Sequence, residues 1–197
     1  MSQSQHIKVL IVGGHRVGKT TLFCQLVRGQ SFPGGNDSLK QSSEYIILNG
    51  NLHIEIHDCL VSSPKSLITQ TWRNVNAIIY MFSYEDLRSL HEVSVWFRHV
   101  KELLCDGLVH QIIVGNKVDL AKISEEESFD STLKTLCKEL SVTDQDKFSV
   151  TATTGDGIDA IKARIGEKFR EYVTRGPFPD SLCIVPRQTH SGCMCIN

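Results

Sequence analysis

The sequence reads Gly13-Gly14-His15-Arg16-Val17-Gly18-Lys19-Thr20 directly after an apolar run at residues 7–12. Residues 21–27 follow with a pattern typical of a helix. A glycine-rich loop between a strand and a helix lets backbone N–H groups curl around phosphate oxygens, and the helix N-terminus adds its partial positive charge. We therefore predict a phosphate-binding loop (P-loop) at residues 13–20. An ordinary glycine turn before a helix is the competing interpretation.

Two side chains of this loop are expected to contact the ligand directly. Lys19 is expected to reach the outer phosphates of a bound nucleotide, where it is a catalytic candidate, and the Thr20 hydroxyl is expected to ligate Mg²⁺. The loop and the residue after it form the first part of the predicted nucleotide-binding set: Gly13, Gly14, His15, Arg16, Val17, Gly18, Lys19, Thr20 and Thr21.

Composition restricts the possible classes of protein. The 197 residues suffice for one domain with a sizeable core, and a net charge of −1 gives no long-range field that would favour nucleic acid. The polar start does not look like a signal peptide, and no apolar run approaches the roughly 20 residues of a membrane-spanning helix. Most of the seven cysteines are scattered singly, which suits a reducing cytosol. We expect a cytoplasmic monomer that binds no nucleic acid.

Strand-like and helix-like segments alternate along the chain, which predicts an α/β protein with a mainly parallel six-stranded sheet and helices on both faces, the P-loop NTPase fold. Asn49-Gly50 predicts an antiparallel hairpin. The domain is expected to span residues 1–173, because a proline-bearing, flexible tail follows at 174–197. The predicted strands lie at residues 7–12, 45–48, 52–58, 77–82, 111–115 and 148–150, and the main helices at 21–27, 89–104, 128–140 and 158–172.

Polar signals follow the predicted strands at the edge where ligands bind in such sheets. A carboxylate at Asp119 can accept from both N–H donors on the guanine edge, which adenine does not offer. Asn116 would brace this loop, and the stem of Lys117 would cover the base. Ala152, between Thr151 and Thr153, would offer its N–H to the guanine oxygen. The sequence therefore predicts that guanine is the base bound.

With these motifs in this order, residues 7–173 resemble the small GTPases of the Ras superfamily. Residues 72–80, 89–90 and 95–97 look like the Rab branch. The resemblance implies GTP, GDP and Mg²⁺ as ligands, with Asp58 in the second shell of the metal. It also implies a switch in membrane or vesicle trafficking, in which GTP holds two loops and hydrolysis releases them. Effectors, exchange factors and activating proteins would bind at residues 30–43 and 59–75.

The chain departs from this family in the segments that perform hydrolysis. The family normally carries Asp-x-x-Gly-Gln after the third strand, whereas this chain has Asp58-Cys59-Leu60-Val61-Ser62. Ser62 is too short to orient the attacking water as the glutamine does. No threonine lies between Thr21 and Thr69, so Ser38 is the substitute Mg²⁺ ligand by position, ahead of Ser42 or Ser43. Phe32 lies about where the family stacks an aromatic ring on guanine.

His15 and Arg16 replace small residues usual in the family's loop, and we expect them to crowd the γ-phosphate side. Arg16 could instead be a built-in catalytic cation or turn out to solvent. We predict intrinsic hydrolysis on the order of 10⁻⁴ per second or slower. A non-cycling pseudo-GTPase that acts as an interaction module is the alternative. A P-loop nucleotide kinase is a third reading, which the motif at residues 116–119 opposes.

The tail ends in Cys193-Met194-Cys195-Ile196-Asn197. This pair of cysteines resembles the lipid-attachment sites of the family but lies two residues inside the usual position. Lipids on Cys193 and Cys195 would hold the protein peripherally on the cytosolic face of an intracellular membrane. Two free cysteines in a flexible tail are the alternative.

Overall fold

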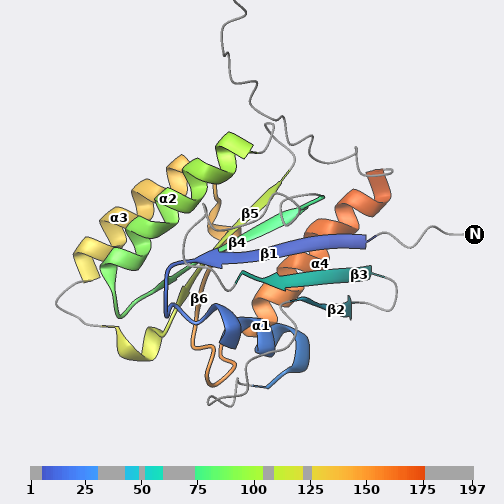
Figure 1. Ribbon diagram of the computed structural model, residues 1–197, viewed down its shortest axis with the longest axis horizontal. Coiled ribbons are helices and arrows are strands. Elements are labelled where there is room, and N and C mark those ends of the chain that lie inside the picture. The colour runs from blue at the N-terminus through green and yellow to red at the C-terminus, as the bar shows by residue number, and fades with distance from the viewer. Residues whose placement is uncertain are drawn as a thin grey trace, which may run out of the picture.

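The computed structural model describes residues 6–30, 43–48, 52–59, 74–103, 109–121 and 126–175. A six-stranded sheet lies at its centre in the order β2-β3-β1-β4-β5-β6 (Figure 1). Neighbouring strands are parallel except for the antiparallel pair of β2 and β3. The strands are β1 (His6–Gly13), β2 (Ser43–Leu48), β3 (Leu52–Asp58), β4 (Ala77–Ser83), β5 (His110–Asn116) and β6 (Lys147–Val150).

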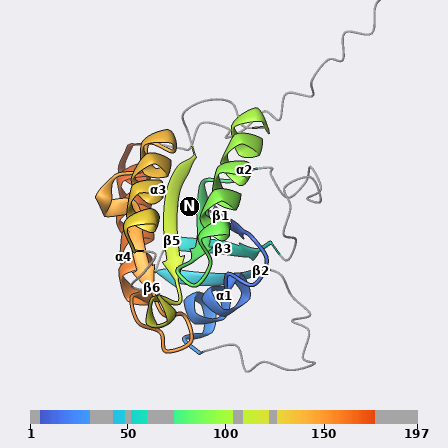
Figure 2. The ribbon, with the colours of Figure 1, turned by 90° about the vertical axis from the view of Figure 1, so that its left-hand side faces the viewer.

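Four α-helices in the described ranges cover the two faces of this sheet. Helices α1 (Lys19–Arg28) and α4 (Ile158–Arg175) pack on one face, and α2 (Leu87–Leu103) and α3 (Glu126–Glu139) pack on the other. Figure 2 shows α1 near β2 and β3, and α4 beside β6. Two short 3₁₀ helices, η3 (Val118–Leu120) and η5 (Asp144–Asp146), follow β5 and precede β6.

Strand β1 shows why the sheet needs helices on both sides. Side chains alternate along a strand, so Ile7 and Val9 enter the core under α1 and α4, whereas Leu10 and Val12 enter the core under α2 and α3. All four are fully buried. A central strand with two apolar faces is stable only between two layers of helices, and the sequence pattern of residues 7–12 anticipated this.

The predicted P-loop architecture is therefore confirmed, with small shifts at element ends. Helix α1 begins at Lys19 because Gly18 before it has a left-handed backbone, φ 97°. The Asn49-Gly50 turn lies outside the described residues, but Leu48 pairs with Leu52 as a hairpin requires. None of the helices described is both long and apolar enough to cross a membrane. The domain boundary at residue 173 stays a prediction.

Candidate functional site

The carboxyl ends of the parallel strands bring the sequence motifs to one edge of the sheet (Figure 1). The P-loop follows β1, and Asp58 ends β3 opposite Ile11 of β1. Asn116 ends β5 and pairs with Val150 at the end of β6. Residues 151–153 follow directly, so four segments that are far apart in the chain meet at the same edge.

Two glycines allow the P-loop to lie close to the sheet. A Cβ atom on Gly13, at φ 152°, would collide with the backbone oxygen of Met81. A Cβ atom on Gly18 would collide with the side-chain amide of Asn116. Both positions also have positive φ, which disfavours residues with a side chain. Glycine is therefore required at position 13 by the neighbouring backbone and at position 18 by the Asn116 side chain.

Lys19 is held inside the loop. Its Nζ donates to the carbonyl oxygens of Gly13 at 3.1 Å and of Gly14 at 2.6 Å, and its side chain is buried. Burial lowers the pKa of Lys19, while the negative charges of Asp58 and Glu92 act in the opposite direction. These contacts keep the ammonium group at the centre of the loop, where a phosphate would meet it.

Thr20 and Asp58, the two residues predicted for the metal site, are in contact. Thr20 Oγ1 donates to Asp58 Oδ2 at 2.6 Å. Asp58 Oδ1 is buried without a hydrogen-bond partner among the described residues. Burial raises the pKa of Asp58, and the bond from Thr20 and the charge of Lys19 oppose this rise. A buried carboxylate oxygen without a partner, next to a hydroxyl group, fits the oxygen ligands that Mg²⁺ prefers.

Of the other metal candidates, Ser43 alone falls within the described residues. Ser38 and Ser42 lie outside the described residues, and Ser43 is in β2, paired with His57. Within the described ranges, no group of three or more His, Cys, Asp or Glu side chains could hold a metal. A magnesium ion bound beside Thr20 would therefore depend on oxygens from phosphate and water as well as from the protein.

Asn116 connects three loops. Its Nδ2 donates to the Val17 carbonyl of the P-loop at 2.9 Å, and its Oδ1 accepts the N–H of Ala152 at 2.9 Å. The side chain is buried. The N–H that we had expected to bind the guanine oxygen is thus already donated within the protein. Sequence analysis did not anticipate this bond, because its partners are 36 positions apart.

The loop predicted to bind the base, residues 116–119, leads into η3. Lys117 has a left-handed backbone, φ 61°, and its Nζ lies 2.8 Å from Glu85 Oε2 at the start of the turn before α2. Asp119 is exposed and accepts a long hydrogen bond of 3.4 Å from Thr151 Oγ1. Thr153 is exposed beside them. The Asp119 carboxylate is therefore accessible to a base.

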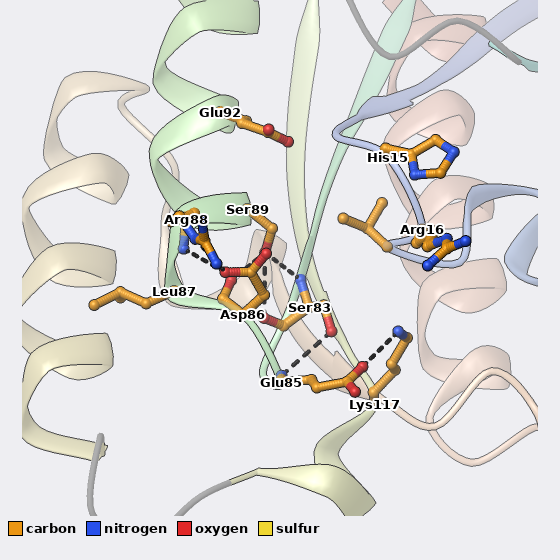
Figure 3. A pocket seen from close by; sticks show the side chains of 11 residues that line it. His15, Arg16, Ser83, Glu85, Asp86, Leu87, Arg88, Ser89, Glu92 and Lys117 are labelled. Atoms are coloured by element: carbon orange, nitrogen blue, oxygen red, sulfur yellow. Dashed lines mark hydrogen bonds and ion pairs between the residues drawn. The ribbon is translucent and has the colours of Figure 1, made fainter.

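A cavity of about 750 Å³ lies between the P-loop and the start of α2 (Figure 3). His15 and Arg16 line its P-loop side, and Glu85 and Glu92 line its opposite side. Arg16 has a left-handed backbone, φ 58°, and both P-loop side chains are exposed. Sequence analysis missed Glu85 and Glu92, since no motif marks them and only the fold brings them to the loop.

Several predicted residues lie outside the described ranges. Most of the two loops expected to contact partners, residues 30–43 and 59–75, lies outside the described ranges. The same holds for the predicted aromatic residue, the glutamine substitute and the two tail cysteines, which are Phe32, Ser62, Cys193 and Cys195.

Comparison with known proteins gives one family match and several distant relatives. Residues 8–169 match the model described as the Ras family. The chain is 28% identical over 139 residues to Ras-related protein Rab-33 of Caenorhabditis elegans, covering 64% of this chain and 44% of that protein. It is 28% identical over 123 residues to GTP-binding protein Rheb of Bos taurus, covering 61% of this chain and 67% of that protein.

A third relative is Ras-like protein family member 11B of Xenopus laevis, 29% identical over 138 residues, covering 64% of this chain and 54% of that protein. The matched part therefore spans between 44% and 67% of the length of these relatives. Their names include Rab, Rheb and Ras-like proteins, so the comparisons point to no single branch.

Proposed function

Because the chain belongs to the Ras family, we propose that it is a guanine-nucleotide-binding switch that takes GTP and GDP with Mg²⁺. The observation that carries this proposal is the Asn116 side chain, which joins the P-loop at Val17 to the loop at Ala152. A phosphate-binding loop and a base-binding loop held by one side chain are suited to a ligand that has both a base and phosphates.

Each part of the nucleotide has a group of this chain to meet it. The N–H groups of the P-loop and the ammonium of Lys19 would bind the phosphates. Thr20 and Asp58 would hold Mg²⁺, which neutralises charge between the outer phosphates when bound. The Asp119 carboxylate would accept the two guanine N–H donors, and the Lys117 stem would lie along the base plane. Thr21 and Thr153 complete the proposed contacts.

Nucleotide content tests this proposal. Protein purified without added nucleotide is expected to carry GTP or GDP, measured by chromatography after denaturation. Asp119→Asn should lose guanine affinity and gain xanthine affinity, because an amide replaces the acceptor pair by one acceptor and one donor. Asp130→Asn, an exposed carboxylate on α3, is the matched control. Unchanged guanine affinity in Asp119→Asn would show that the base is recognised elsewhere.

We propose slow GTP hydrolysis, on the order of 10⁻⁴ per second or slower. The support is the sequence: Ser62 stands where the family has a glutamine, and the switch threonine is replaced, with Ser38 the nearest substitute. Arg16 is exposed on the cavity side of the loop, and a catalytic role for it stays a hypothesis. Single-turnover hydrolysis by the purified protein measures this rate, and a much faster rate would contradict the proposal.

A pseudo-GTPase that does not cycle is the second candidate. The observation that favours it is in the sequence: Ser62 stands where the family has a glutamine, and no threonine lies between Thr21 and Thr69. Such a module would show bound nucleotide, or none, without measurable exchange or hydrolysis. Exchange and hydrolysis rates measured on the same preparation distinguish the two candidates.

A trafficking role of the Rab type is also part of the proposal. Residues 30–43 and 59–75 would contact effectors, exchange factors and activating proteins, and lipids on Cys193 and Cys195 would bind the cytosolic face of an intracellular membrane. Two lipids matter because one chain anchors only marginally. Intact mass of protein from its native cells tests the tail, and an unmodified mass would contradict lipid attachment.

A further inference from the structure

Glu92 of α2 lies against the backbone of the P-loop. A Cβ atom built on Gly14 would coincide with the Glu92 carboxylate, and the carboxyl carbon of Glu92 would be only 2.9 Å from it. Figure 3 shows the Glu92 side chain extending from α2 toward the P-loop across the cavity. Gly14 does not have positive φ, and the Glu92 carboxylate is the nearest group that a side chain at this position would meet.

The other carboxylates of the cavity are neutralised, whereas Glu92 is not. Glu85 Oε2 lies 2.8 Å from Lys117 Nζ. Asp86 Oδ1 lies 3.5 Å from Arg88 Nε. Among the described residues Glu92 forms no ion pair within 4 Å, and the cation on which its charge acts is Lys19, inside the P-loop. Within the part of the chain that the structure describes, a carboxylate without an ion-pair partner therefore lies against the P-loop backbone at Gly14.

We propose that Glu92 sets the preference of the P-loop between nucleoside diphosphate and triphosphate, by repelling the charge of the outermost phosphate. This inference rests on the proposed function, since it requires that the loop bind a nucleotide. The carboxylate acts on every phosphate, but the triphosphate carries one more negative charge than the diphosphate. Glu92 therefore weakens triphosphate binding more than diphosphate binding and biases the protein toward the diphosphate form.

The size of this effect follows from Coulomb's law. For a separation of about 8 Å between the Glu92 carboxylate and a bound phosphate, and an effective dielectric constant of about 40 to 80, one added charge changes affinity about two- to six-fold. The effect should shrink at high salt, because the Glu92 side chain is exposed and screened.

Glu92→Gln tests the inference, because it removes the charge and keeps the shape. Dissociation constants for Mg²⁺–GDP and for Mg²⁺ with a non-hydrolysable β,γ-imido GTP analogue are measured on the full chain by calorimetry. The ratio of triphosphate to diphosphate affinity should rise about two- to six-fold at 50 mM salt and less at 500 mM. Glu92→Asp keeps the charge and should leave this ratio close to that of the wild type.

Glu102→Gln is the matched control. It makes the same charge change on the same helix, about 15 Å further along α2 at 1.5 Å per residue. It should leave the affinity ratio unchanged. An unchanged ratio in Glu92→Gln, or an equal rise in Glu102→Gln, would overturn the inference while the proposed function stands. A wild-type protein that binds neither nucleotide would overturn the proposed function itself.

Discussion

Asn116 and Val17 are 99 positions apart in the chain, yet the Asn116 amide donates to the Val17 carbonyl at 2.9 Å. The same side chain accepts the Ala152 N–H. Glycine at position 18 makes this bond possible, because any larger residue there would occupy the space of the amide. One buried side chain thus holds three loops of the candidate site in a fixed relation.

Asn116→Ala should therefore destabilise the protein and disorganise the site. The substitution leaves a buried N–H at Ala152 and a carbonyl at Val17 without partners, each at a cost of about 1–3 kcal/mol. We expect a loss of about 2–4 kcal/mol in the free energy of unfolding, measured by urea denaturation. Gln145→Ala, which truncates an exposed amide, should change it by less than about 0.5 kcal/mol. Equal losses in both variants would show that Asn116 has no bracing role.

Gly13 and Gly14 should respond differently to alanine. At Gly13 the new methyl group would meet the Met81 backbone oxygen at positive φ, and neither can move cheaply. We expect Gly13→Ala to cost about 2 kcal/mol or more. At Gly14 the methyl group meets only the end of the flexible Glu92 side chain, which can rotate away into the cavity. Gly14→Ala should cost less than about 1 kcal/mol in the same thermal or urea measurement.

Arg16→Gly should stabilise the fold. Arg16 has φ 58°, a left-handed conformation that costs a residue with a side chain about 1–2 kcal/mol. Glycine avoids this strain but loses more backbone entropy on folding, so we expect a net gain of about 0.5–1 kcal/mol. Differential scanning calorimetry should show a higher Tm, and Arg16→Asn should give an intermediate value. A lower Tm in Arg16→Gly would show that the side chain makes stabilising contacts that outweigh the strain.

Stability should decrease on acidification because of a buried cluster at the opposite end of the sheet from the site. Asp146 Oδ1 accepts from Arg164 Nε at 2.7 Å and lies 3.0 Å from His110 Nε2, and Thr143 donates to Oδ2 at 2.9 Å. Burial lowers the pKa of His110, while Asp146 raises it and Lys168 and Arg164 lower it. Burial alone would raise the pKa of Asp146, but the bonds from Arg164 and Thr143 lower it overall.

The lowered pKa of His110 and the lowered pKa of Asp146 both reduce the stability of the fold as the pH falls. A folded His110 with a lowered pKa binds its proton less readily than an unfolded one, so stability falls as pH falls below about 6.5. The lowered pKa of Asp146 adds a second loss as pH falls below about 4. Urea denaturation between pH 4 and 8 should show the first loss, and His110→Gln should reduce it. Part of the loss should remain, because burial also lowers the pKa of His57. His91→Gln, at an exposed position, should leave the profile unchanged.

Much of the fold could be predicted from local patterns in the sequence. Residues 7–12 and 77–82 have apolar side chains on both faces, and this predicted central strands covered by helices. The glycine spacing before Lys19 predicted a phosphate loop, because only a few backbone conformations allow such a turn between a strand and a helix. The hairpin at Leu48 and Leu52 followed from the Asn-Gly signal between two strand-like runs.

The contacts that assemble the site could not be predicted from local sequence patterns. Covalent geometry and hydrophobic periodicity act over a few residues, so the sequence by itself determined the strands, the helices and the phosphate loop between them. The bond from Asn116 to Val17, the donation of the Ala152 N–H to Asn116 and the approach of Glu92 to Gly14 were decided only by the tertiary structure. The physical reason is that each depends on how strands distant in the chain align at one edge of the sheet, which is set by packing of the whole core.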